Sequence, residues 1–119
     1  MRLWLLLFSA CAPMLAGPAG AHAFLDHASP AVGSTVHTAP TQVKLWFTQE
    51  LEAEFSTVQV STAGGERIDK ADARLDPADA TLLSVSLPPL APGRYRVKWR
   101  ALSVDTHATE GDFTFDVAP

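Results

Sequence analysis

Sulfur is scarce in this chain. Of its 119 residues, one is cysteine, Cys11, and two are methionine, Met1 and Met14. All three lie within the first 14 positions, so a chain that loses this segment has no disulfide framework, no thiolate nucleophile and no soft sulfur ligand. Any metal site in the remainder is therefore expected to use nitrogen and oxygen donors.

The sequence also lacks an excess of positive charge. It has 9 Lys and Arg against 13 Asp and Glu, and without Arg2 the balance is 8 against 13, a net charge of −5. A mildly acidic domain with no strong basic patch is a poor candidate for binding nucleic acid or an anionic membrane. We therefore expect no nucleic-acid partner.

The first 21 residues lack the roughly 20 unbroken apolar residues that a membrane-spanning helix requires. Arg2 precedes a short apolar run at residues 3–8, and a tail with Pro13 and Gly17 ends in Ala19-Gly20-Ala21. A positive start, a short apolar core and small residues at the end predict a cleavable secretory signal peptide over residues 1–21. Residues 22–119 then form one small domain, not transmembrane after cleavage.

The cleavage position decides which residue begins the exported chain. A cut after Ala21, which fits the preference for small residues, makes His22 the N-terminus. A cut after Ala23 would remove His22 and leave Phe24 first. A cut after Ala19 would leave Gly20-Ala21-His22, whose third-position histidine would bind Cu(II) or Ni(II) through backbone amides.

Alternating apolar and polar residues predict an all-β domain. In the first strong segment Val43, Leu45 and Phe47 share one face, and we interpret Trp46, Trp99 and the phenylalanines as core residues. The strands are expected at residues 42–48, around 58–60, and at 81–87, 94–101 and 112–117. Six or seven short strands without helical periodicity predict an antiparallel Greek-key β-sandwich or barrel of about seven strands, Ig-like or cupredoxin-like.

The connections between these strands have their own patterns. Gly64-Gly65 predicts a tight hairpin turn, and residues 51–55 a bend or helical turn. The Asp-rich residues 69–80 predict a loop with at most a short strand near Leu75. The spacing from Leu90 through Gly93 to Tyr95 resembles the tyrosine corner of β-sandwiches, in which the phenol hydrogen bonds to nearby backbone.

An Asp-x-His pair, Asp105 and His107, lies between the last two predicted strands. In an extended backbone the two side chains would point to the same face and could share one cation. His22, as an N-terminus, could add its α-amine and its imidazole, because an N-terminal amine gives up its proton easily near neutral pH. His27 and His37 lie in polar turn regions and are expected at the surface.

Three nitrogens and a carboxylate oxygen, without sulfur, suit Cu(II) in tetragonal geometry. Zn(II) or Ni(II) would bind more weakly to the same donors. The donor set at His22, Asp105 and His107 therefore predicts one tightly bound Cu(II) ion and no comparable Cu(I) site.

Several segments together resemble the CopC family of periplasmic copper-resistance proteins. They are His22-Ala23-Phe24-Leu25, Ser29-Pro30-Ala31-x-Gly33-Ser34, Leu45-x-Phe47-Thr48 and Ser103-x-Asp105-x-His107-x-x-x-Gly111-x-Phe113-x-Phe115. The resemblance implies a seven-stranded Greek-key β-barrel in the periplasm and a Cu(II) site at His22, Asp105 and His107. It also implies transfer to an inner-membrane copper transporter of the CopD type. The Met-rich Cu(I) site of some members is not carried over, because residues 22–119 contain no methionine.

Two positions depart from the family pattern. Thr106 stands where the family often has Gly between the Asp and His ligands, which is expected to stiffen the turn. Gln49 replaces a carboxylate thought to support the N-terminal amine, and Glu50 next to it would point to the opposite face of a strand. Loss of a supporting residue commonly lowers metal affinity by about 10–100-fold, so the affinity is expected to differ although the ligands are kept.

We interpret the chain as a Cu(II) carrier or buffer of copper resistance or uptake, and not as an enzyme. One alternative is a copper monooxygenase-like enzyme, since such enzymes also use an N-terminal histidine chelate. A carboxylate ligand, however, would fill a coordination position and favour Cu(II) binding. The other alternative is a metal-free adhesion or structural β-sandwich, in which Asp105 and His107 would be surface residues.

Overall fold

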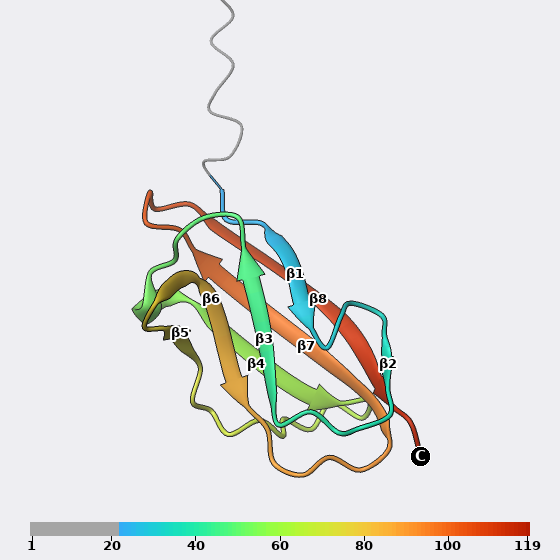
Figure 1. Ribbon diagram of the computed structural model, residues 1–119. Coiled ribbons are helices and arrows are strands. Elements are labelled where there is room, and N and C mark those ends of the chain that lie inside the picture. Colours follow the sequence, from blue (N-terminus) through green and yellow to red (C-terminus); the bar gives the residue numbers. More distant parts are fainter. Residues whose placement is uncertain (1–21) are drawn as a thin grey trace, which may run out of the picture.

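Two four-stranded sheets pack face to face in the computed structural model, which describes residues 22–119 (Figure 1). The predicted signal peptide, residues 1–21, lies outside the described residues. The first sheet, called the β3 sheet, has the order β1 (Leu25–Ser29), β3 (Gln42–Phe47), β6 (Asp79–Ser86) and β5 (Arg74–Asp76). The second, called the β8 sheet, has the order β2 (Thr35–Val36), β8 (Ala108–Val117), β7 (Gly93–Leu102) and β4 (Thr57–Thr62). The predicted all-β sandwich is confirmed.

The described part of the chain has eight strands where about seven were expected. Two of the eight, β2 and β5, are very short. β2 pairs with β8 in parallel, whereas the other ladders are antiparallel. The predicted helical turn is the 3-10 helix η1 (Ala53–Phe55). No helix within residues 22–119 is long and apolar enough to cross a membrane.

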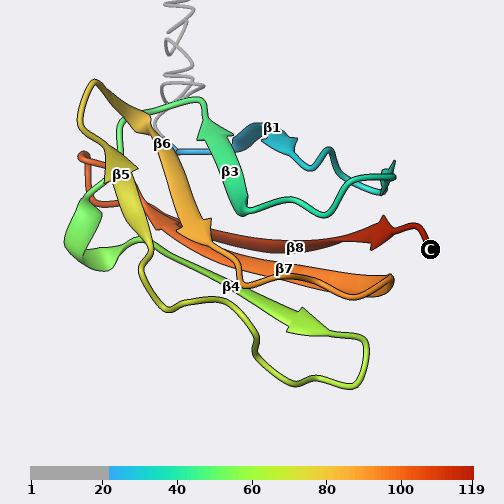
Figure 2. The same cartoon turned by 60° about the horizontal axis from the view of Figure 1, so that its bottom comes forward.

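The turn predicted at Gly64-Gly65 is present, but the prediction that a second hairpin strand follows it is wrong. Gly65 has φ +90°, and the Thr62 N–H donates to the Glu66 carbonyl at 2.8 Å. After the turn, however, only one bridge joins Ser61 to Arg67, and the ladder partner of β4 is β7. The Asp-rich segment that follows turns away to the β3 sheet, as Figure 2 shows.

The core lies between the two sheets and is built from the inward positions of the alternating strands. In β7 every second side chain from Tyr95 to Ala101 is buried, and the residues between them are exposed. Burying one Val, Leu or Phe side chain contributes about 1.5–3 kcal/mol. The fully buried side chains include Val43, Leu45, Val58, Val60, Leu83, Val85, Val97 and Phe115.

The tyrosine corner that the sequence predicts is present. The Tyr95 hydroxyl donates a hydrogen bond of 2.6 Å to the Ala91 carbonyl, and its ring stacks on Phe115 at 5.6 Å between centroids. The phenol therefore fixes the connection that leads into β7, as the resemblance indicated.

The interpretation of all large aromatic residues as core is wrong for three of them. Trp46 is only half-buried and lies on the outer face of the β3 sheet, while Phe24 and Phe55 are 54% and 58% exposed. In β3 the buried positions are Val43, Leu45 and Phe47, so the alternation itself places Trp46 outward. Trp99 is buried as expected.

Gly111 of β8 gives Trp99 the space that it occupies in the core. The two residues are register partners in the β7–β8 ladder, and a Cβ on Gly111 would lie 2.7 Å from Cζ2 of Trp99. The Trp99 ring in turn meets Phe47 edge to face at 5.1 Å. Glycine is therefore required at this position for packing between the sheets.

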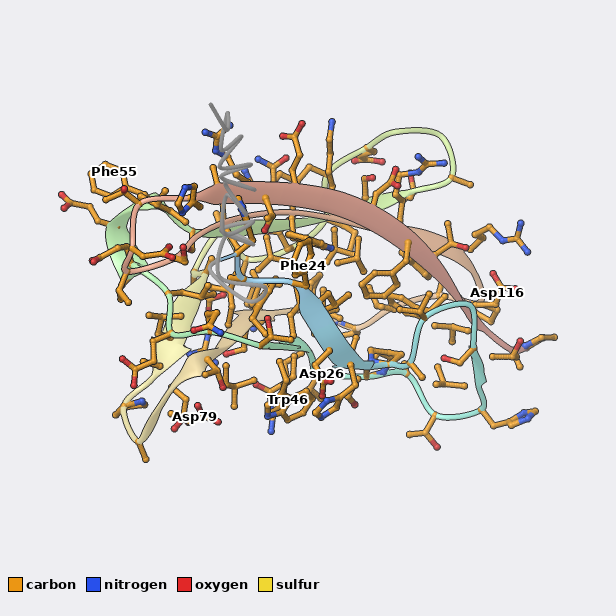
Figure 3. All side chains as sticks on the ribbon, turned by 90° about the horizontal axis from the view of Figure 1, so that it is seen from above. Phe24, Asp26, Trp46, Phe55, Asp79 and Asp116 are labelled. Carbon is orange, nitrogen blue, oxygen red and sulfur yellow. The ribbon has the colours of Figure 1, made fainter. Side chains whose placement is uncertain are left out.

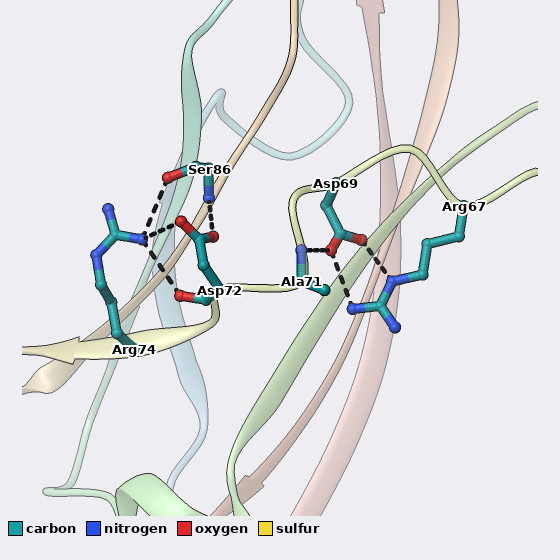
Figure 4. Close-up of polar contacts among 6 residues, drawn as sticks. All are labelled: Arg67, Asp69, Ala71, Asp72, Arg74 and Ser86. Atoms are coloured by element: carbon teal, nitrogen blue, oxygen red, sulfur yellow. Dashed lines mark hydrogen bonds and ion pairs between the residues drawn. The ribbon is translucent and has the colours of Figure 1, made fainter.

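The loop before β5 is fixed by the buried carboxylate of Asp69 (Figure 4). Asp69 accepts two hydrogen bonds from the Arg67 guanidinium and one each from the backbone N–H of Ala71 and Val60, all between 2.8 and 3.0 Å. Burial opposes ionisation of this carboxyl, but these hydrogen bonds outweigh it and lower the pKa of Asp69 below its ordinary value. The carboxylate therefore ties the Asp-rich loop to β4.

We predict that Gly111→Ala destabilises the protein by about 1–3 kcal/mol, because the new methyl group must displace the ring of Trp99. Urea unfolding followed by tryptophan fluorescence would measure the loss and the altered environment of the indole. Gly64→Ala is the matched control, because its nearest neighbour, Thr62 Oγ1, would lie at an ordinary 3.7 Å. Equal stability of the two variants would contradict the packing role.

We predict that Asp69→Asn lowers the free energy of unfolding at pH 7 by about 2 kcal/mol, since an amide cannot replace a buried carboxylate bound to Arg67. A lowered folded-state pKa contributes stability above the ordinary Asp value of about 3.9, and this stability is lost as the pH falls through the folded pKa. Wild type and variant should therefore converge in acid. Asp72→Asn, at a carboxylate that is 43% exposed, should lower the free energy of unfolding by less. A difference from wild type that persists unchanged at pH 3 would rule out this role.

Candidate metal centre

The Asp-x-His pair lies in the turn that joins β7 to β8. The two strands pair from Gly93 and Val117 to Leu102 and Ala108, and residues 103–107 close the hairpin. The Ser103 N–H donates to the His107 carbonyl at 3.0 Å, and the Thr106 N–H donates to the Ser103 carbonyl at 2.9 Å. The expectation of extended backbone between Asp105 and His107 is therefore wrong.

The turn brings Asp105 and His107 together although the backbone is not extended. His107 Nδ1 lies 3.4 Å from Asp105 Oδ1, and the two side chains are 51% and 43% exposed. Thr106 between them has φ +75°, a left-handed conformation that glycine adopts without strain. Threonine at this position therefore carries backbone strain that glycine would not have.

Ser103 supports the turn from its buried side. Its side chain is 1% exposed, and its hydroxyl bonds the Asp105 carboxylate as well as the His107 carbonyl at 3.1 Å. The hydrogen bond from Ser103, together with the neighbouring His107, lowers the pKa of Asp105. Asp105 is therefore an ionised oxygen donor at neutral pH, held in a defined orientation.

His22 reaches this turn from the other end of the described chain. Its imidazole ring lies 4.5 Å from that of His107 between centroids, at an interplanar angle of 51°, and 6.0 Å from the Phe24 ring. Figure 1 shows the start of β1 next to the end of β3 and the start of β8, at one end of the sandwich. The fold thus brings the two histidines that the sequence singled out side by side.

Two threonines hold the segment that carries His22. The Thr48 hydroxyl accepts from the Phe24 N–H at 3.0 Å and donates to the His22 carbonyl at 3.4 Å. The Thr109 hydroxyl donates to the Ala23 carbonyl at 2.5 Å, and Ala23 itself is fully buried. Sequence reasoning did not find these contacts, although Thr48 belongs to one of the segments that carried the resemblance.

The side chains alone do not form a complete metal site. Among residues 22–119 no group of three or more His, Cys, Asp or Glu side chains lies close enough together to hold an ion. In the full-length chain the His22 nitrogen is part of a peptide bond, so the α-amine of the predicted chelate does not exist. The paired rings of His22 and His107, with Asp105 beside them, are the donors that the fold itself supplies.

The two other histidines occupy separate surroundings. His27 stacks on Trp46 at 4.4 Å with an interplanar angle of 9°, and its Nδ1 lies 2.7 Å from Asp26. Figure 3 shows Asp26 beside Trp46 on the outer side of β1, away from β8. His37 is exposed after β2. Both are at the surface as expected, but the sequence did not predict the stack on Trp46.

The segment after β3 also differs from the expectation. β3 ends at Phe47, so Gln49 lies in a bend and Glu50 in irregular structure, and strand alternation does not decide their direction. The Glu50 carbonyl accepts from the Val104 N–H at 3.1 Å and so supports the Asp-x-His turn through backbone. Gln49 is half-buried and Glu50 is exposed.

Comparison with known proteins identifies the family. Residues 25–118 match the CopC domain, a span that includes Asp105 and His107 and begins just after His22. Protein YobA of Escherichia coli K12 is 38% identical over 98 residues, covering 82% of this chain and 79% of YobA. Copper resistance protein C of Escherichia coli is 34% identical over 104 residues, 82% of each protein.

A solved structure agrees in sequence and in fold. The crystal structure of CopC from Methylosinus trichosporium OB3b superposes with a TM-score of 0.77 at 35% identity. The superposition covers 82% of this chain and 95% of that one. With a family match over most of its length and relatives above 30% identity, the chain belongs to the CopC family.

Proposed function

We propose that this protein binds copper in copper resistance or transport, as a carrier or buffer of one Cu(II) ion held by His22, Asp105 and His107. The observation that carries the proposal is the 4.5 Å separation of the His22 and His107 rings. The pair joins the segment before β1 to the turn between β7 and β8, so an ion bound here would take ligands from two distant parts of the chain. The name of copper resistance protein C, a relative at 34% identity, agrees with it.

The chemistry of the donors supports Cu(II). Residues 22–119 contain neither Cys nor Met, so the ligands are imidazole nitrogen, carboxylate oxygen and, after processing, an α-amine. These are donors that Cu(II) prefers, and Cu(II) heads the affinity order of the divalent ions. The ionised carboxylate of Asp105 would also offset part of the charge of the ion.

Export and processing after Ala21 are part of the proposal, with residues 1–21 as the signal peptide and the periplasm as the location. Support comes from Ala23, which is fully buried and whose carbonyl accepts from Thr109. Cleavage after Ala23 would remove this residue and His22 together. Cleavage after Ala19 would place the new amine two residues before His22, away from its imidazole.

We further propose that the protein carries copper without catalysing a reaction on it. Asp105 would take a position on the ion that an oxygen-activating enzyme must leave open. The exposed donors on a turn suit an ion that is taken up and passed on, and an inner-membrane copper transporter of the CopD type is the proposed acceptor. A metal-free structural role would not require two imidazoles at this position, whereas a copper site uses both as donors.

We predict that the processed protein takes up one tight Cu(II) ion and has no comparable Cu(I) site, because sulfur ligands are absent from residues 22–119. Competition titrations with chelators specific for each oxidation state would measure both affinities. The stoichiometry would follow from the same titration. Tight Cu(I) binding would contradict the assignment of the donor set.

We predict that adding one residue before His22 damages the site about as severely as His107→Ala, although it removes no side chain. The addition converts the α-amine to an amide and moves the new amine away from the imidazole of His22. Electron paramagnetic resonance of the Cu(II) form would report the loss of nitrogen donors. Asp105→Asn should weaken binding moderately, since an amide oxygen is a poorer donor than a carboxylate.

Two matched controls accompany this series. His27→Ala and His37→Ala should leave binding nearly unchanged, because His27 is engaged with Trp46 and Asp26 and His37 is exposed after β2. The proposed site is wrong if the extended protein keeps the nitrogen-rich spectrum, or if His27 proves essential, even where copper still binds.

A further inference from the structure

The three residues before β1 are held by two hydroxyl groups that come from different sheets. Thr48 follows β3 directly, and Thr109 is the second residue of β8. Residues 22–24 therefore lie across the open end of the sandwich with one threonine on each side. Figure 1 shows the start of β1 at this end of the sandwich, near the end of β3 and the start of β8.

Each residue of this segment makes one of these hydrogen bonds, His22 and Ala23 as acceptors and Phe24 as a donor. Thr48 Oγ1 bonds both the His22 carbonyl and the Phe24 N–H, at 3.4 and 3.0 Å, and Thr109 Oγ1 bonds the Ala23 carbonyl at 2.5 Å. After the proposed processing this segment would be a chain end, and chain ends are poorly ordered unless they are tied down. The backbone of the segment that carries His22 is thus held from two sides.

We propose that Thr48 and Thr109 are positioning residues of the copper site, which hold His22 against His107 before the ion arrives. The inference rests on the proposed function, since it assigns these threonines a role in that same site. A chelate whose donors are already placed loses less conformational freedom when it binds, and its affinity is higher for that reason. Neither threonine has to touch the ion.

The hydroxyl groups can be removed without disturbing the ladders that build the fold. The Thr48 N–H donates to the Phe24 carbonyl at 2.9 Å through backbone alone, and β8 pairs with β7 along its whole length. A valine at either position keeps the branched shape and the backbone bonds. It removes only the bonds from the side chain to residues 22–24.

The test uses the processed protein beginning at His22, with Thr48→Val, Thr109→Val and both together. Thr109→Val, which removes one hydrogen bond, should bind Cu(II) about fivefold more weakly, and Thr48→Val, which removes two, should be weakened at least as much. If the two effects add, the affinity of the double variant should fall by about 25-fold or more. The Cu(II) electron paramagnetic resonance spectrum should show a broader range of site geometries, and Thr48→Ser and Thr109→Ser should restore both properties.

Thr114→Val is the matched control within β8. Thr114 lies between the buried Phe113 and Phe115, so strand alternation places its side chain on the outer face, away from residues 22–24. This variant should keep wild-type affinity. Hydrogen exchange in the metal-free protein gives an independent measure: Thr48→Val should speed exchange of the Phe24 N–H, which loses its acceptor.

The outcomes separate this inference from the proposed function. A wild-type protein that binds no Cu(II) through His22 would overturn both. A wild-type protein that binds as proposed, with valine variants of unchanged affinity and spectrum, would overturn the positioning role alone. Weaker binding by the valine variants, with rescue by serine and no effect of Thr114→Val, would support it.

Discussion

The long antiparallel pairing of β7 with β8 determines where most other features of this protein lie. Its ten register pairs, from Gly93 with Val117 to Leu102 with Ala108, set Trp99 opposite Gly111 in the core. The same register leaves residues 103–107 as the turn at its end. A shift by one residue would reverse every side chain of one strand and separate Trp99 from the space that Gly111 provides. Core packing and the position of the candidate ligands therefore depend on one ladder.

The part of the fold that strand alternation encodes could be predicted from the sequence. The alternation in β3 and β7 reports which side chains face the other sheet, and the structure buries those same positions. The residue type of Trp46 favours the core, but its place in the alternation puts it on the outer face. The missing strand after Gly64-Gly65 has another cause, since Asp69 binds Val60 and turns the chain away before a second ladder forms.

The candidate site residues could be singled out from the sequence, but how the fold arranges them could not. Asp105 and His107 stand out by spacing, yet Thr106 has positive φ and makes the segment a turn, which residue type alone would argue against. The support beneath the turn comes from Ser103, whose burial depends on the packed sandwich. The contacts of Thr48 and Thr109 with residues 22–24 join segments far apart in the chain, so local patterns contain no signal for them.

The location of the paired histidines at the surface affects how easily an ion could be bound and released. The Asp105 and His107 side chains are about half exposed, on a turn at the end of a rigid ladder. A ligand set deep between the sheets would hold an ion firmly but would have to open the core to release it. Donors on a turn can be reached by an acceptor without any loss of core packing, and the backbone bonds from Ser103 and Glu50 keep that turn in place. The same fold thus combines a packed β-sandwich with an accessible pair of imidazoles, which suits the proposed uptake and transfer of an ion.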